Sequence, residues 1–235
     1  MSRVLIVKAG ETLAEIRALR GDFEDWIAAG MELASDEVEV ADARRGAPLP
    51  DPARPAGIIV TGSSALVTDR EPWSERAAGW LREVVGAGTP LLGICYGHQL
   101  LAHALGGVVG DNPRGREIGT VTLELRPEAA HDPLLQVLSA GEPVHATHVQ
   151  AVLALPAGAR HLASSRGDPY QAFAVADRAW GVQFHPEFDA DVIRGYLAGR
   201  RDQIAAEGLD VAALRAAVRE SSAGPRLLRR FAALL

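Results

Sequence analysis

The 235-residue chain contains one cysteine, no long apolar run and no excess of positive charge, and each shortage excludes a class of protein. A single cysteine cannot form an intramolecular disulfide or a cysteine-rich metal site, so it is either a small buried residue or a reactive thiol. The apolar runs are far shorter than the roughly 20 residues needed to span a bilayer. A net charge of −6, with mostly scattered arginines, argues against binding to nucleic acid, which requires clustered positive charge.

The first residues also lack the features of a targeting segment. A charged region, an apolar region and a small-residue cleavage site do not follow one another there, as they do in a signal peptide. We therefore expect a cytoplasmic protein with no membrane segment. With 48% hydrophobic residues, the chain can close one sizeable core, or a core with a modest extension.

Short apolar runs alternate with helical patterns in the first half of the chain, which is typical of parallel strands covered by helices on both faces. The expected strands are Val4–Val7, Val38–Val40, Gly57–Thr61 and Pro90–Ile94, and the expected helices are Glu24–Leu33 and Glu71–Val85. Shorter strands are expected at Ile118–Leu125, Pro143–Thr147, His161–Ser164, Gln171–Val175 and Trp180–Phe184. Helical patterns return at Ala190–Ala206, Val211–Val218 and Leu227–Leu235. We predict an α/β fold with a doubly wound, mostly parallel sheet in residues 1–188 and a helical C-terminal extension in residues 189–235 packed on it.

The cysteine lies where an apolar strand passes directly into a helix. Glycines at positions 93 and 97 flank Cys95 and permit the close approaches and unusual backbone angles of a tight turn. This order predicts a nucleophile elbow that projects Cys95 from the carboxyl end of the sheet. The positive end of the helix would lower the pKa of the thiol from its usual value of ~8.5. The alternative is a buried, inert cysteine, and the elbow alone does not decide between the two.

A second polar group follows another apolar strand, at His185-Pro186-Glu187. A thiol nucleophile needs an adjacent imidazole that removes its proton and later protonates the leaving group. The imidazole in turn needs a third group that fixes its tautomer, and Glu187 is placed to fold back toward His185. The sequence therefore predicts a triad of Cys95, His185 and Glu187.

A third segment, Thr61-Gly62-Ser63, follows a strand that would lie beside the elbow in a parallel sheet. Attack on an amide builds negative charge on the carbonyl oxygen, which two fixed backbone N–H groups can stabilise. We expect these donors to be the amides of Ser63 and Tyr96. An ordinary strand-ending turn is the alternative for this segment.

These segments together resemble the class I glutamine amidotransferases, and most closely the glutaminase domain of GMP synthase. The residues that carry the resemblance are Gly93–Gln99, Thr61–Ser63, Arg116–Gly119 and Phe184–Glu187. The resemblance covers roughly residues 4–188. It implies a flavodoxin-like fold and hydrolysis of glutamine through a γ-glutamyl thioester on Cys95. The positions it implies for substrate binding are Gly62, Gln99, Thr147, His148, Val149 and Gln150.

Three positions depart from the family pattern. Tyr96 stands where Leu or Phe is usual, Ser63-Ser64 where Gly-Pro is usual, and Val149-Gln150 where Gly-Asp is usual. The missing aspartate removes a partner for the α-ammonium group of the donor. A γ-glutamyl peptide is therefore an alternative donor to free glutamine.

No nucleotide-binding motif of an ammonia-accepting synthase follows the predicted triad. We favour a glutaminase that supplies a separate synthase, with a γ-glutamyl peptidase or a non-catalytic regulatory protein as alternatives. The C-terminal helices either pack on the core or dock a partner, which includes a second copy of the chain. No cofactor is expected. No metal site is expected either, because His98 and His103 lack the i, i+4 spacing of a zinc pair.

Overall fold

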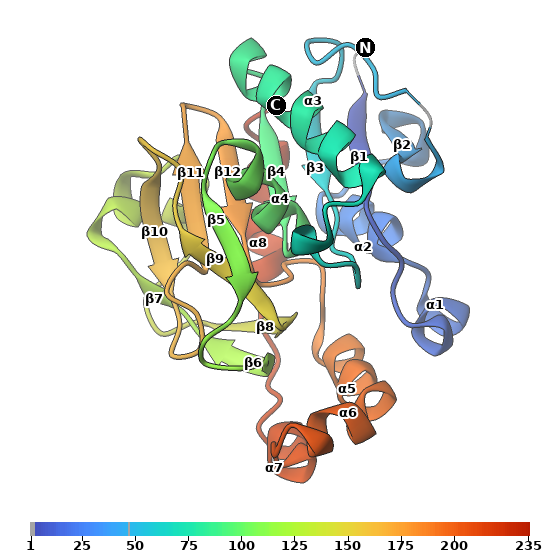
Figure 1. Ribbon diagram of the computed structural model, residues 1–235, viewed down its shortest axis with the longest axis vertical. Coiled ribbons are helices and arrows are strands. Elements are labelled where there is room, and N and C mark those ends of the chain that lie inside the picture. Colours follow the sequence, from blue (N-terminus) through green and yellow to red (C-terminus); the bar gives the residue numbers. More distant parts are fainter. Residues whose placement is uncertain (1–2, 47) are drawn as a thin grey trace.

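The computed structural model describes residues 3–46 and 48–235 and has a central eight-stranded sheet (Figure 1). The strand order is β2-β1-β3-β4-β12-β11-β10-β7, in which the first five strands are mutually parallel and the last three are joined by antiparallel pairings. Their bounds are β1 (Val4–Lys8), β2 (Val38–Asp42), β3 (Gly57–Val60), β4 (Leu91–Ile94), β7 (Glu124–Leu125), β10 (Arg160–Ser164), β11 (Ala172–Val175) and β12 (Ala179–Val182). Two small antiparallel pairs join β5 (Val108–Asp111) to β9 (Gln150–Ala154) and β6 (Glu117–Thr122) to β8 (Pro143–His148).

Helices cover both faces of the sheet. Their bounds are α1 (Ala14–Arg20), α2 (Phe23–Gly30), α3 (Pro72–Ala87), α4 (Tyr96–Ala104), α5 (Ala190–Gly199), α6 (Arg201–Ala206), α7 (Val211–Ala216) and α8 (Ala223–Ala232). Short 3₁₀ helices occur at Ser35–Glu37, Ala43–Arg45, Val67–Asp69, Pro127–His131 and Leu135–Val137. Within the described residues, no helix is both long and apolar enough to cross a membrane.

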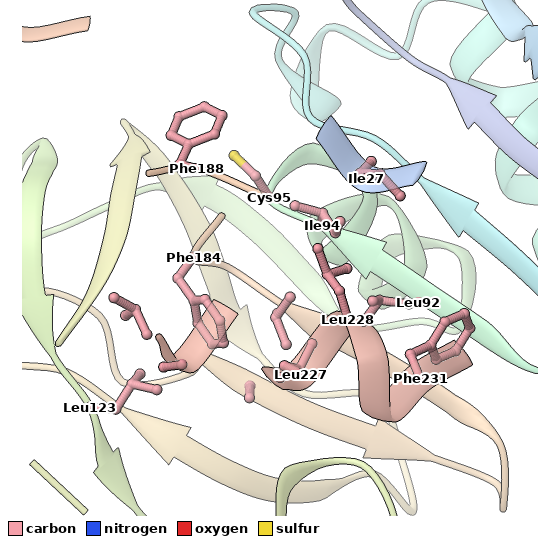
Figure 2. Packing of buried hydrophobic residues seen from close by; sticks show 14 of the residues in the cluster. Ile27, Leu92, Ile94, Cys95, Leu123, Phe184, Phe188, Leu227, Leu228 and Phe231 are labelled. Carbon is pink, nitrogen blue, oxygen red and sulfur yellow. The ribbon is translucent and has the colours of Figure 1, made fainter. Parts of the chain in front are cut away.

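Neighbouring residues of β1 point to opposite faces of the sheet and enter two hydrophobic clusters. Ile6 belongs to the cluster that contains Ile27 of α2 and Leu228 of α8 (Figure 2). Leu5 belongs to the other cluster, with Trp80 of α3 and the buried face of α4. Each such large apolar side chain stabilises the fold by about 1.5–3 kcal/mol when fully buried. Helix α8, from the end of the chain, is therefore part of the main core.

Local sequence signals explain where several helices begin and end. Asp22 caps α2 by accepting a hydrogen bond from the first helical amide at 2.9 Å, and the Asp25 carboxylate accepts one from the Asp22 amide at 2.9 Å. Helix α3 begins at Pro72 and ends at Ala87, and Gly88 after it has a φ of 73°. Asp189 caps α5 by accepting a hydrogen bond from the Val192 amide at 2.8 Å.

The C-terminal helices contact the rest of the chain at two places. Helix α5 packs against α1, β6 and β8, and α7 packs against β6, whereas α8 packs against α2 and β8. Figure 1 shows α5, α6 and α7 grouped beyond one end of the sheet, while α8 returns to cover one of its faces. Residues of α5 to α7 therefore lie next to segments that contribute to the site described below.

Most of the expected strands are confirmed to within a few residues, as are the two expected helices of the first half. The single strand expected over Ile118–Leu125 is wrong, because β6 pairs with β8 whereas β7 joins the central sheet beside β10. Helix α1 and strands β5 and β9 were not expected. Helix α1 buries Ile16 as its one buried residue, so it lacks the apolar periodicity that marks a helix in a sequence. The single helix expected over Ala190–Ala206 is wrong, because Arg200 has a non-helical φ of −107° and ψ of 15° and separates α5 from α6. The last helix begins at Ala223, earlier than expected.

Candidate active site

Cys95 occupies the turn between the end of β4 and the start of α4. Its backbone has a φ of 52° and a ψ of −100°, a combination rarely adopted by residues other than glycine. Such a conformation costs on the order of 1–3 kcal/mol and persists only where the surrounding structure enforces it. The amide of Cys95 donates to the Val182 carbonyl at 2.8 Å, and its carbonyl accepts from the Gln99 amide at 3.1 Å. The structure thus has the strand–cysteine–helix geometry expected from the sequence.

The two glycines near Cys95, Gly93 and Gly97, allow neighbouring backbone segments to approach closely. A Cβ atom on Gly93 would lie 2.4 Å from the Gly97 carbonyl oxygen, and a Cβ atom on Gly97 would lie 2.4 Å from the Val60 carbonyl oxygen. Both distances are too short for any side chain. Neither glycine has a positive φ, so the expected unusual backbone angle belongs to Cys95 itself.

His185 and Glu187 follow β12, the strand paired with β4. Nδ1 of His185 lies 2.7 Å from Oε1 of Glu187, whose side chain is fully buried. The imidazole ring stacks on Phe188 with centroids 4.0 Å apart and on Phe23 with centroids 6.1 Å apart. Glu187 and the two aromatic rings together fix the orientation of the imidazole. Figure 2 shows Cys95 and Phe188 at the same edge of the core.

The charges of this group act on one another. Burial alone would lower the pKa of His185, but the Glu187 carboxylate and the Cys95 thiolate raise it to about 10. Burial alone would raise the pKa of Cys95, but His185 and His148 together outweigh this effect and lower it. The environment therefore favours a thiolate–imidazolium pair. Because Nδ1 is engaged by Glu187, Nε2 is the ring nitrogen available to the thiol.

Gly62, at the end of β3, fits between the two reactive side chains. A Cβ atom there would lie 2.9 Å from Cε1 of His185 and 3.8 Å from Cβ of Cys95. Ser63 is packed just as closely, since a Cβ atom on Gly10 would lie 2.5 Å from the Cα atom of Ser63. The structure therefore brings the loop after β3 against the elbow, as the sequence predicts.

A pocket with about 370 Å³ of empty volume opens beside the Cys95 thiol. It is lined by residues that the sequence singles out and by others that it does not: Ser63, Ser64, Ala65, Leu66, Cys95, Tyr96, Gln99, Thr147, His148, Val149, Gln150 and Arg200. Gly62, His185 and Glu187 are not part of this lining. Arg200 was not expected, and it comes from the junction of α5 and α6.

Hydrogen bonds fix the polar wall of the pocket. Nε2 of Gln99 donates to the Gln150 carbonyl at 2.7 Å and to Oε1 of Gln183 at 3.0 Å. The Gln150 side chain instead donates to Oγ1 of Thr68 at 2.7 Å. The Cys95 sulfur lies 3.9 Å from the Thr147 carbonyl oxygen. Gln99 is therefore held as a rigid part of the wall.

Tyr96 is a lining residue of the pocket, and its phenol contacts α3. The hydroxyl lies 2.6 Å from Oγ of Ser74 in α3, and the ring stacks on Trp73 with centroids 5.6 Å apart. The polar tip that distinguishes Tyr96 from the usual Leu or Phe is therefore satisfied inside the α3–α4 interface.

His148 is held as a cation next to the thiol. Nδ1 lies 2.9 Å from the Gln150 carbonyl oxygen and Nε2 lies 3.0 Å from Oε2 of Glu117. Because a carbonyl and a carboxylate only accept hydrogen bonds, both ring nitrogens carry protons. Burial alone would lower the pKa of His148, but Glu117 and Asp168 raise it. The positive charge on His148 also lowers the pKa of Cys95.

The remaining candidate histidines have structural roles. His98 is fully buried against Phe173, and burial lowers its pKa to about 3, so the ring is neutral. Nε2 of His103 lies 2.9 Å from Oε1 of Glu75. Among residues 3–46 and 48–235, no three His, Cys, Asp or Glu side chains are arranged to hold a metal ion.

Comparison with known proteins gives a family match for most of the chain. A family model described as glutamine amidotransferase class-I matches residues 26–195, which is most of the chain. The chain belongs to the class I glutamine amidotransferase family. The resemblance inferred from the sequence motifs is thereby confirmed.

Relatives of this amidotransferase include a GMP synthase [glutamine-hydrolyzing] from Thermomicrobium roseum, 43% identical over 133 residues. That match includes 57% of the chain and 23% of the length of the relative. A putative glutamine amidotransferase from Saccharomyces cerevisiae is 36% identical over 155 residues, which include 64% of this chain and 60% of the yeast protein. The chain thus spans about a quarter of the first relative and well over half of the second.

Solved structures show the same architecture. A glutamine amidotransferase from Methylobacillus flagellatus has a TM-score of 0.78 and 25% identity, and the match covers 99% of this chain and 93% of that one. A glutamine amidotransferase from Thermotoga maritima has a TM-score of 0.76 and 24% identity, with 98% and 96% of the two chains covered. The flavodoxin-like fold is thereby confirmed, and most of the C-terminal helical region lies within the match.

Proposed function

We propose that this amidotransferase hydrolyses the γ-amide of glutamine through a γ-glutamyl thioester on Cys95. The observation that carries the proposal is the arrangement of Cys95, His185 and Glu187 at the ends of two paired strands, with the thiol opening into a pocket. The lowered pKa of Cys95 and the raised pKa of His185 supply a nucleophile and an acid in the same site.

In the first step the Cys95 thiolate attacks the amide carbon of the donor, and the carbonyl oxygen becomes negative. The backbone amides of Ser63 and Tyr96, both of which line the pocket, are the proposed donors to this oxygen. The imidazolium of His185 gives its proton to the departing nitrogen as the carbon–nitrogen bond breaks, which leaves a thioester and ammonia. Water, deprotonated by His185, then hydrolyses the thioester to glutamate and restores the thiol.

We assign donor binding to Gly62, which lies outside the pocket lining, and to the lining residues Gln99, Thr147, His148, Val149 and Gln150. Gly62 acts by leaving space between Cys95 and His185. The Gln150 side chain is engaged by Thr68, so its contribution comes through its carbonyl, which anchors Gln99 and His148. The ammonia is proposed to pass to a separate synthase, as the name of the T. roseum relative suggests.

A second candidate activity is the hydrolysis of γ-glutamyl peptides. Within the described chain, no carboxylate lines the pocket to hold a donor α-ammonium group, and this holds for free glutamine and for a γ-glutamyl peptide alike. The chemistry on Cys95 is the same, with an amino acid in place of ammonia as the leaving group.

The test is glutamate and ammonia release from L-glutamine by the wild-type protein, Cys95→Ala and His185→Gln. We expect no turnover with Cys95→Ala and a loss of at least about a thousandfold with His185→Gln. His103→Gln, which alters another histidine paired with a glutamate, is the matched control and should retain activity. If Cys95→Ala hydrolysed glutamine as fast as the wild-type protein, the thioester mechanism would be refuted. If the wild-type protein hydrolysed γ-glutamyl dipeptides but not glutamine, the peptides would be the donor instead of glutamine.

A further inference from the structure

Arg200 is a pocket residue that comes from outside the sheet. It lies in the break between α5 and α6 and lines the pocket together with Cys95, Gln99 and Thr147. The charge of Cys95 acts on Arg200, which places the guanidinium within electrostatic range of the reactive sulfur. Its carbon Cζ lies 5.5 Å from the centroid of the Tyr196 ring, so the aromatic face positions one side of the guanidinium.

Nearby carboxylates do not neutralise this guanidinium. The carboxylate of Glu207 is taken by Arg116, whose Nε and Nη2 lie 2.6 and 2.8 Å from its two oxygens. No side chain within the described ranges accepts a hydrogen bond or ion pair from the Arg200 guanidinium. Nη1 of Arg116 is itself buried without a partner among the described residues. The charge of Glu207 is therefore matched by Arg116, and the Arg200 guanidinium has no carboxylate partner of its own among the described residues.

The lining of the pocket likewise contains cationic side chains but no carboxylate among the described residues. Its charged members are Arg200 and His148, and neither Asp nor Glu is among the lining residues of the described chain. The positive charge of His148 is already matched by Glu117, whereas that of Arg200 is not. A ligand that fills the pocket with its reactive carbon at Cys95 therefore meets an unmatched cation at another part of the wall.

We propose that Arg200 binds the α-carboxylate of the γ-glutamyl donor and makes this carboxylate a requirement for binding. A guanidinium presents parallel N–H donors that match both oxygens of a carboxylate. The proposal rests on the proposed function, and it names the group by which the same pocket selects its donor. It also gives the α5–α6 junction a direct role in specificity.

The test measures binding separately from chemistry. L-glutamine and L-glutamine α-amide, in which a neutral carboxamide replaces the α-carboxylate, are titrated calorimetrically into Cys95→Ala, Cys95→Ala/Arg200→Ala and Cys95→Ala/Arg200→Lys. Cys95→Ala/Arg201→Ala is the matched control, because Arg201 is the neighbouring arginine and is exposed. Thermal unfolding of each variant checks that the fold is retained.

We expect Arg200→Ala to weaken glutamine binding by about tenfold to a hundredfold, as for the loss of a hydrogen-bonded charge pair. The α-amide should bind weakly to all variants, with less than about a twofold difference between them, and Arg200→Lys should recover part of the glutamine affinity. Arg201→Ala should leave both ligands unaffected.

Equal losses for glutamine and its α-amide on Arg200→Ala would overturn the proposal, as would unchanged affinity for glutamine or a lack of measurable glutamine binding to Cys95→Ala. Failure of the proposed function has a different signature. In that case the wild-type protein releases no ammonia from glutamine, while the Arg200-dependent preference for the carboxylate is still present in the titrations.

Discussion

Replacement of Glu187 by Gln tests the electrostatic core of the site. The substitution keeps a hydrogen-bond acceptor beside Nδ1 of His185 and removes the negative charge 2.7 Å away. Relative to its ordinary value of 6.5, a His185 pKa of about 10 corresponds to about 5 kcal/mol of extra stabilisation of the imidazolium. Without the carboxylate, Cys95 remains to oppose the effect of burial, so the pKa of His185 should fall from its wild-type value.

The consequence appears at Cys95. Loss of even half of that free energy would reduce the ratio of the thiolate–imidazolium pair to its neutral form by about fiftyfold. In the wild-type protein the ion pair forms above the lowered pKa of Cys95 and is lost as the pH rises through the raised pKa of His185. The two apparent pKa values belong to the coupled pair, and in Glu187→Gln the interval between them should narrow.

The assay is the rate of alkylation by iodoacetamide between pH 5 and pH 10, followed by mass spectrometry. Since Cys95 is the single cysteine, every modified protein molecule reports on this thiol. We expect a nearly constant rate around neutral pH for the wild type, and for Glu187→Gln a slower rate that rises with pH. Glu75→Gln, which removes the carboxylate beside His103, is the matched control. The electrostatic argument is refuted if Glu187→Gln has the same rate and pH profile as the wild type.

Three further changes test the surrounding structure. Gly62→Ala places a methyl group 2.9 Å from the clamped His185 ring, so we expect kcat/KM for glutamine to fall about a hundredfold with an unfolding penalty of about 1–3 kcal/mol; an unchanged kcat/KM would contradict this. Asp22→Asn should lower the free energy of unfolding by about 2–4 kcal/mol at pH 7 in urea titrations. Burial would raise the pKa of Asp22, but its hydrogen bonds lower it below 3.8. The loss of unfolding free energy in Asp22→Asn should therefore shrink as the pH falls through that range, and a loss that does not change with pH would contradict this prediction. Tyr96→Phe leaves Ser74 without its partner and should cost about 1 kcal/mol in the same titrations, with unchanged kcat because the hydroxyl points into α3; a large fall in kcat would place the phenol in the reaction.

The sequence predicts the elements of the site that depend on local order. Each strand that ends at the site is a short apolar run in the sequence. The residue that follows such a strand therefore lies at the edge of the sheet. This is why Cys95 and His185 could be paired from their neighbours alone, although they are far apart in the chain. The same reasoning placed the Thr61–Ser63 loop beside the elbow.

Features that depend on tertiary contacts could not be predicted in this way. Arg200 is one of 24 lysines and arginines, and nothing next to it in the sequence distinguishes it from the exposed Arg201. Its role depends on the break between α5 and α6, which the continuous helical pattern conceals. The pairing of His148 with Glu117 likewise requires the register of β6 against β8, where these two residues lie opposite each other.

The two histidines near Cys95 differ in what their protons can do. Both are buried beside a carboxylate, and both lower the pKa of the thiol. Both ring nitrogens of His148 are occupied, by Glu117 and by the Gln150 carbonyl, so its proton has no route to a substrate. His185 has one nitrogen held by Glu187, while Nε2 makes no hydrogen bond to the described residues. A buried thiolate needs compensating positive charge before it attacks and again when the thioester is hydrolysed, whereas the leaving group needs a proton when the carbon–nitrogen bond breaks. We infer that His148 keeps its positive charge through the cycle, so that His185 can change protonation while a cation remains in the site.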